Sequence, residues 1–91
     1  MTAGSNTPGK AEIREAIVTL ATERGAGKTI CPSEVARHVA GADEKNWRPL
    51  MPSIRTLATE LVAQGKVDIK KGGKVVDPQK FEGIYRIAIK K

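Results

Sequence analysis

The sequence contains a single cysteine, Cys31, and a single histidine, His38. One cysteine cannot form a disulfide within the chain, and it cannot supply the cysteine cluster of a structural zinc site. A chain without disulfides fits a reducing compartment, so we expect a cytoplasmic protein. We also expect no metal ion and no organic cofactor.

Aromatic residues are scarce too, since Trp47, Phe81 and Tyr85 are the only three in the chain. The core must therefore consist mainly of Ile, Val, Leu and Ala. No apolar run approaches the length of about 20 residues that a membrane-spanning helix needs. The N-terminus also lacks the apolar segment of a secretory signal. We expect no membrane partner, a flexible polar tail over residues 1–9, and one small domain over residues 10–91.

Positive charge is concentrated in the last third of the chain. Residues 1–61 contain 8 Lys/Arg and 7 Asp/Glu, a net charge of +1, whereas residues 62–91 contain 8 Lys/Arg and 3 Asp/Glu, a net charge of +5. An asymmetry of this kind favours a polyanionic partner and says little about the fold.

Three segments have the apolar spacing of amphipathic helices. The first is predicted over residues 10–24. The second covers residues 32–40, because Pro32 suits the first position of a helix. The third covers residues 52–64 and follows a short helical turn near Trp47, a residue that we expect to close the connection between helices.

The remaining sequence has the pattern of β-strands. A short extended piece is expected just before Pro32. Residues 66–71 alternate apolar and polar side chains, and residues 84–89 form a second such run. Between them lie the turn Gly72-Gly73, a short segment at residues 74–76 and a longer loop.

The order helix, short strand, helix, helix, strand, wing, strand is that of a winged helix-turn-helix. We therefore predict an α+β fold with three helices and a small antiparallel sheet that carries a wing. The third helix would be the recognition helix, and the loop between the last two strands would be the wing.

Three pieces of the sequence are distinctive in combination: the motif C-P-S-E-V-A from Cys31 to Ala36, the motif W-R-P-L-M-P from Trp47 to Pro52, and Gly65-Lys66-Val67 followed by Lys74 to Pro78. Together they resemble a small family of short bacterial proteins of unassigned function, which implies a winged-helix fold and no established activity. The connection between the second and third helices is longer than in a simple helix-turn-helix, which affects the docking angle of the third helix.

The third helix presents one candidate nucleic-acid-binding surface. Side chains about 100–200° from Ile54 by helical spacing should point away from the core. Arginine and hydroxyl side chains in the first half of a recognition helix suit base edges and phosphates. The alternative is a plain solvated face. The candidate residues are Arg48, Ser53, Arg55, Thr56 and Thr59.

The wing is the second candidate surface. Lys70, Lys71 and Lys74 surround two glycines that allow close approach to a backbone, and lysines there would contact phosphates without reading sequence. The alternative is a hairpin whose edge lysines only prevent strand-to-strand aggregation.

Nothing in the sequence indicates an enzyme. Gly25 to Thr29 resembles the end of a phosphate-binding loop, but Thr22 stands where that motif needs glycine, and no strand precedes it. His38 has no second histidine or catalytic partner, so a surface position is expected. Cys31 is expected to be a buried or half-buried structural thiol at the start of a helix.

Double-stranded DNA binding is the leading interpretation. The first alternative is a protein-interaction module that uses Val75, Val76 and Phe81. The second is an RNA-binding module that reads shape and backbone. The sequence leaves the target site and the oligomeric state open.

Overall fold

The computed structural model describes residues 9–81 and 83–90, and helix α1 (Lys10–Arg24) begins directly after Gly9. The predicted tail over residues 1–9 therefore lies, apart from Gly9, outside the described residues. α1 buries Ile13, Ala16 and Ile17 on one face and ends at Gly25. Its bounds match the prediction.

Helix α2 (Pro32–Ala40) begins where the proline predicted it. The Cys31 backbone N–H donates to the Glu34 carboxylate at 2.7 Å, which satisfies a donor that the helix itself leaves free. Cys31 is half-buried and His38 is exposed, as predicted.

The connection to the third long helix is itself helical. α3 (Glu44–Trp47) is capped by Asp43, whose side chain accepts from the Lys45 N–H at 3.0 Å. A single 3-10 turn at Arg48–Leu50 then runs into α4 (Met51–Ala63), one residue ahead of the predicted helix. Trp47 is partly buried against the core, as expected of a residue that closes this connection.

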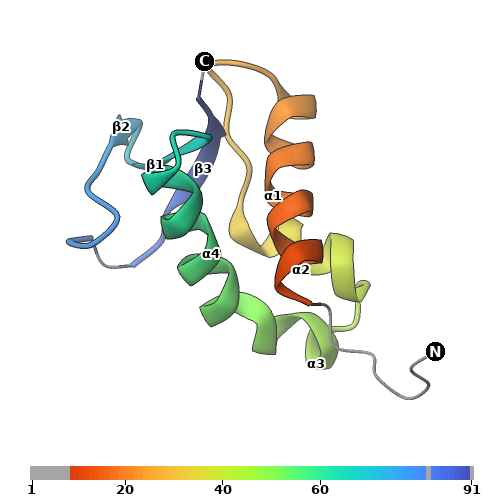
Figure 1. Cartoon of the computed structure of the whole chain (residues 1–91). Coiled ribbons are helices and arrows are strands. Elements are labelled where there is room, and N and C mark those ends of the chain that lie inside the picture. Colours follow the sequence, from red (N-terminus) through yellow and green to blue (C-terminus); the bar gives the residue numbers. More distant parts are fainter. Residues whose placement is uncertain (1–8, 82, 91) are drawn as a thin grey trace.

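Three short strands follow the helices (Figure 1). β1 (Val67–Lys71) lies in the middle of an antiparallel sheet, with β2 (Lys74–Val75) on one side and β3 (Arg86–Ile89) on the other. The last strand begins at Arg86 rather than at the predicted Ile84. Arg86 lies opposite Lys70, so Ile84 would need Gly72 as its partner, where the chain has already turned.

The extended piece before α2 joins the same sheet through Ile30. Its N–H donates to the Ile87 carbonyl at 2.8 Å, and the Ile87 N–H donates back at 2.9 Å. The sheet therefore runs β2, β1, β3 and then Ile30.

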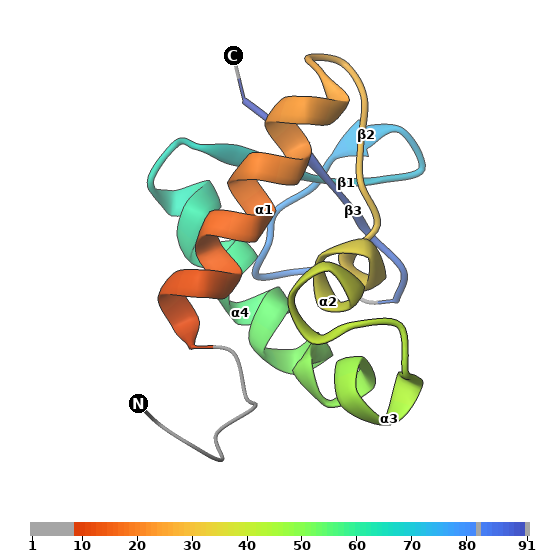
Figure 2. The same cartoon turned by 90° about the vertical axis from the view of Figure 1, so that its right-hand side faces the viewer.

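The core lies between this sheet and helices α1, α2 and α4 (Figures 1 and 2), and it is mainly aliphatic. Ile17, Ile30, Ile54 and Ile87 have no exposed surface, and Phe81 and Tyr85 complete the core at the wing end. Three main helices followed by a three-stranded antiparallel sheet confirm the predicted α+β class and are consistent with a winged helix.

Candidate nucleic-acid interface

The wing opens with a two-residue hairpin between β1 and β2. Gly72 and Gly73 both have positive φ, 61° and 83°, which is the conformation of a type I′ turn. Lys71 and Lys74 flank the turn and lie directly opposite each other. The two glycines therefore place two cations side by side at the end of the ribbon.

A second pair of like charges lies one position along the ribbon. Lys70 faces Val75 on β2 and Arg86 on β3. Like charges directly opposite each other in a sheet are unfavourable. The ion pairs found among the described residues join Arg14 to Glu60, Arg24 to Glu34 and Arg48 to Glu44, so none of them neutralises the wing.

The solvent-facing side of α4 carries small polar side chains. Pro52, Ser53 and Thr56 are exposed and Thr59 is half-buried. Thr56 donates its hydroxyl proton to the Pro52 carbonyl at 3.2 Å, and Thr59 donates to the Arg55 carbonyl at 2.9 Å. Each of these hydroxyl oxygens still has lone pairs that accept hydrogen bonds.

Arg48 stands just before α4 and is largely exposed, with 70% of its side chain accessible. It forms an ion pair with Glu44, four residues earlier. An exposed pair of this kind contributes little stability. Arg48 is therefore available to a second anion at small cost.

Arg55 is a predicted contact residue, and its side chain was expected to point outward into solvent. The structure instead places it against Phe81. Its Nη2 donates to the Phe81 carbonyl at 2.7 Å, and its guanidinium lies 4.1 Å from the centre of the Phe81 ring. Helical spacing directed Arg55 away from the core, but it could not show that the loop after β2 folds back over this side of α4.

The apolar residues of the wing also differ from expectation. Phe81 is only 6% exposed and packs edge-on against Tyr85, with 5.1 Å between ring centres. It therefore cannot belong to the contact surface of the protein-interaction alternative. Among the described residues, the large apolar side chains that are exposed are Val75, at 59%, and Ile84, at 84%.

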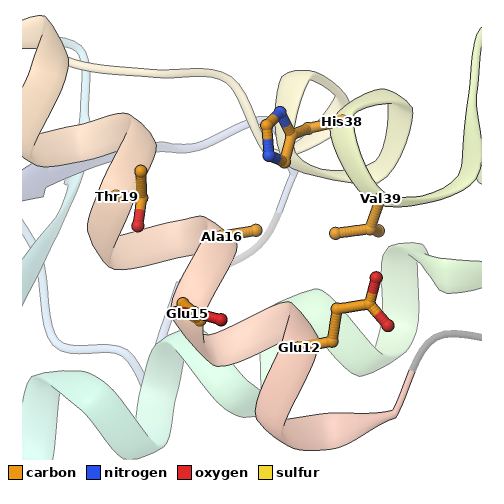
Figure 3. Close-up of a pocket in the computed structure, with 6 residues that line it drawn as sticks. All are labelled: Glu12, Glu15, Ala16, Thr19, His38 and Val39. Carbon is orange, nitrogen blue, oxygen red and sulfur yellow. The ribbon is translucent and has the colours of Figure 1, made fainter.

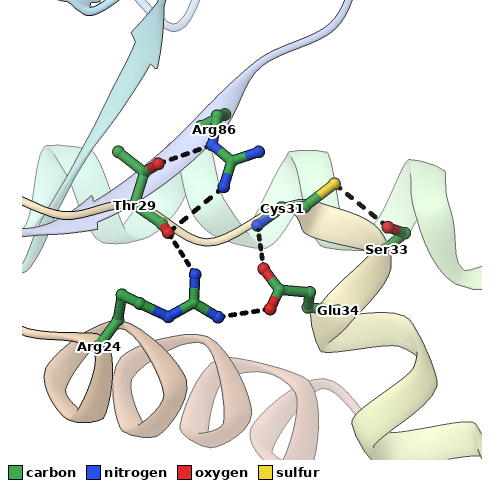
Figure 4. Close-up of polar contacts among 6 residues, drawn as sticks. All are labelled: Arg24, Thr29, Cys31, Ser33, Glu34 and Arg86. Carbon is green, nitrogen blue, oxygen red and sulfur yellow. Dashed lines mark hydrogen bonds and ion pairs between the residues drawn. The ribbon is translucent and has the colours of Figure 1, made fainter.

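Sequence reasoning missed a polar network that ties the sheet to α1 and α2 (Figure 4). Arg86 donates its Nε–H to the Thr29 hydroxyl at 2.6 Å, and Arg24 donates to the Thr29 carbonyl at 2.7 Å. Arg24 also pairs with Glu34. The hydrogen bond from the Cys31 backbone, helped by Arg24, lowers the pKa of Glu34 although partial burial opposes it. The residues of this network are far apart in the sequence, so no local sequence pattern predicts it.

Glu12, Glu15 and His38 are among the residues that line an open hollow between α1 and α2 (Figure 3). Within the described residues, no group of three or more His, Cys, Asp and Glu side chains is arranged to hold a metal ion.

Among the residues that the structure describes, no helix is long and apolar enough to cross a membrane. No curated protein matches the chain. A family model described as a protein of unknown function (DUF3253) matches residues 10–90, nearly the whole chain. The expectation of a family without assigned function is thereby confirmed, and the chain belongs to the DUF3253 family.

Proposed function

We propose that the protein binds double-stranded DNA. Lys70, Lys71 and Lys74 would contact phosphates, and the exposed side of α4 would face the major groove. The observation that carries the proposal is the ribbon of like charges around the Gly72-Gly73 turn, with no ion pair to it among the described residues.

Electrostatics supports an anionic partner. Two like-charge pairs raise the free energy of the folded chain in the absence of a partner. They are Lys71 opposite Lys74 and Lys70 opposite Arg86. A phosphate backbone would convert this repulsion into attraction and would release its counterions on binding. The three lysines among these side chains then favour the complex.

The surface of α4 would supply whatever sequence preference exists. Ser53, Thr56 and Thr59 carry hydroxyl groups that suit several base edges, and Arg48 before the helix suits guanine or a phosphate. α4 itself has one cation, Arg55, and one anion, Glu60, so its net charge is zero. We therefore expect the wing to supply most of the affinity and α4 to supply modest selectivity.

The test is duplex binding by fluorescence anisotropy across a salt series. The Lys70/Lys71/Lys74→Ala triple variant is compared with Lys28/Lys45/Lys90→Ala. Both variants lower the formal net charge from +6 to +3, and the control lysines lie outside the hairpin. The wing variant should lose affinity and flatten the salt dependence by about 0.9 in slope for each phosphate contact that it removes.

If both triple variants lose affinity equally, the wing is not the binding site and net charge alone drives the interaction. If structured RNA competes better than duplex DNA, the RNA alternative replaces this proposal. If the parent protein binds neither nucleic acid at low salt, the proposal is wrong.

The protein-interaction alternative keeps one specific observation in its favour, which is the exposure of Val75 and Ile84 on the wing. A protein contact there should be lost in Val75→Ser and Ile84→Ser and retained in the wing triple variant. DNA binding should show the opposite pattern.

A further inference from the structure

The connection from β2 to β3 meets α4 at Phe81, through Arg55. At its β2 end, Val76 continues the ladder by donating to the Ile69 carbonyl at 2.9 Å. Beyond Val76, the backbone and side-chain hydrogen bonds of Asp77 to Lys80 are local to a turn. The position of the loop therefore depends on side-chain contacts near Phe81.

Arg55 supplies two of these contacts at once. Its guanidinium lies over the Phe81 ring, while its Nη2 donates to the carbonyl of the same residue. A flat guanidinium suits both tasks, because its face covers the ring while its N–H groups point outward in the plane. The ammonium group of lysine has no such face.

A chain of contacts links Phe81 to Lys71 in the hairpin of β1 and β2. Phe81 packs against Tyr85, and both rings are nearly fully buried. Between them in sequence, Gly83 lies beside the Lys71 ammonium, since a Cβ atom built on Gly83 would be 3.4 Å from Lys71 Nζ. The docked loop therefore forms part of the surroundings of a wing lysine.

We propose that Arg55 is a positioning residue: it docks the loop on α4 and thereby fixes where Lys71 stands relative to the exposed side of that helix. This proposal rests on the proposed DNA-binding function for its consequence in binding. The docking itself is a property of the free protein.

The first arm of the test uses the free protein. We would measure ¹⁵N relaxation order parameters of Phe81, Gly83 and Tyr85 in the parent, in Arg55→Lys and in Arg55→Met. Arg14→Lys is the matched control, since Arg14 also contacts α4, through Glu60 at 3.7 Å, but lies away from this loop. Order parameters should be about 0.85 in the parent and the control, and that of the exposed Gly83 should fall clearly in both Arg55 variants, while those of the buried Phe81 and Tyr85 should fall less.

The second arm measures duplex affinity at fixed salt. Arg55→Lys keeps the positive charge, so a direct phosphate contact by residue 55 would be largely retained. A positioning role instead predicts a loss of up to about tenfold in Arg55→Lys, because apparent affinity falls with the docked fraction of the loop and a contact of this kind shifts the ratio of docked to released loop by about tenfold. Arg14→Lys should bind like the parent.

Unchanged order parameters in both Arg55 variants would overturn the proposal. A mobile loop with parent-like affinity in Arg55→Lys would overturn the link to Lys71. If the parent binds no duplex, the proposed function fails while the relaxation arm still decides whether Arg55 docks the loop.

Discussion

Lys70 on β1 lies directly opposite Arg86 on β3, at the wing end of the pairing between these two strands. Arg86 donates its Nε–H to the Thr29 hydroxyl at 2.6 Å, and it forms no ion pair among the described residues, although its charge helps to lower the pKa of Glu34. The charge of Lys70 therefore works against folding unless a partner anion is present.

Lys70→Glu should stabilise the free protein, because it replaces a like-charge pair with an opposite-charge pair across two strands. The expected gain in the free energy of unfolding is about 0.2–1 kcal/mol at low salt. Urea denaturation measures it. Lys70→Gln, which removes the repulsion without adding attraction, should lie between the two, and the gain should shrink at high salt. A less stable Lys70→Glu protein would contradict the reading of this pair as repulsive.

The turn at Gly72-Gly73 should tolerate asparagine in its first position but not a β-branched residue in its second position. Asparagine followed by glycine is favoured in type I′ turns, so Gly72→Asn should be close to neutral. Gly73→Val places a β-branched residue at a φ of 83° and should cost roughly 1–2 kcal/mol or more of unfolding free energy. Urea denaturation of the two variants makes the comparison, and equal stabilities would show that the hairpin opens without cost.

Glu34 should make stability depend on pH in the acid range. Its pKa in the folded protein lies below the ordinary value of 4.5, so the ionised carboxylate is favoured by folding. The stabilisation is complete above 4.5 and disappears as the pH falls through the lowered folded pKa. Denaturation of the parent and Glu34→Gln across this range should show a difference at neutral pH that vanishes in acid. A constant difference would mean that the Glu34 charge contributes nothing.

Tyr85 should make stability depend on pH in the alkaline range. Burial raises its pKa from 10.0 to about 12, and its hydroxyl has no hydrogen-bond partner among the described residues. Folding therefore favours the neutral phenol, and this stabilisation is present below pH 10 and is lost as the pH rises toward 12. Tyr85 is the only tyrosine, so phenolate absorbance reports it without interference.

Removal of the same hydroxyl gives a second measurement. A buried hydroxyl without a partner costs about 1–3 kcal/mol. Tyr85→Phe should therefore be at least as stable as the parent near neutral pH, and its alkaline unfolding should lose the tyrosine contribution. A clear loss of stability in Tyr85→Phe would indicate that the hydroxyl is satisfied in solution.

The helices could be predicted closely because their signals are local. Apolar spacing, Pro32 and the glycines after each helix fix their bounds within about a turn. The pairing of β1 with β2 follows likewise from two adjacent glycines.

The surroundings of Arg55 could not be predicted, since they depend on Phe81, 26 residues later, in a loop without periodicity. Helical geometry gives the direction of a side chain but not which distant segment meets it. The same limit explains why the sequence predicts Phe81 at the contact surface and Ile84 within the last strand.

The bridge between Ile30 and Ile87 has a consequence for how the chain acquires its structure. Ile87 sits between β1 and Ile30, so the sheet reaches its full width only after residue 87 has emerged from the ribosome. The helices form from neighbouring residues, whereas this closure joins positions 57 apart and should be slow. During synthesis, the apolar faces of the helices would therefore stay exposed until this part of the sheet has formed. A nascent chain stalled before residue 87 should be digested by proteases far more readily than the finished protein.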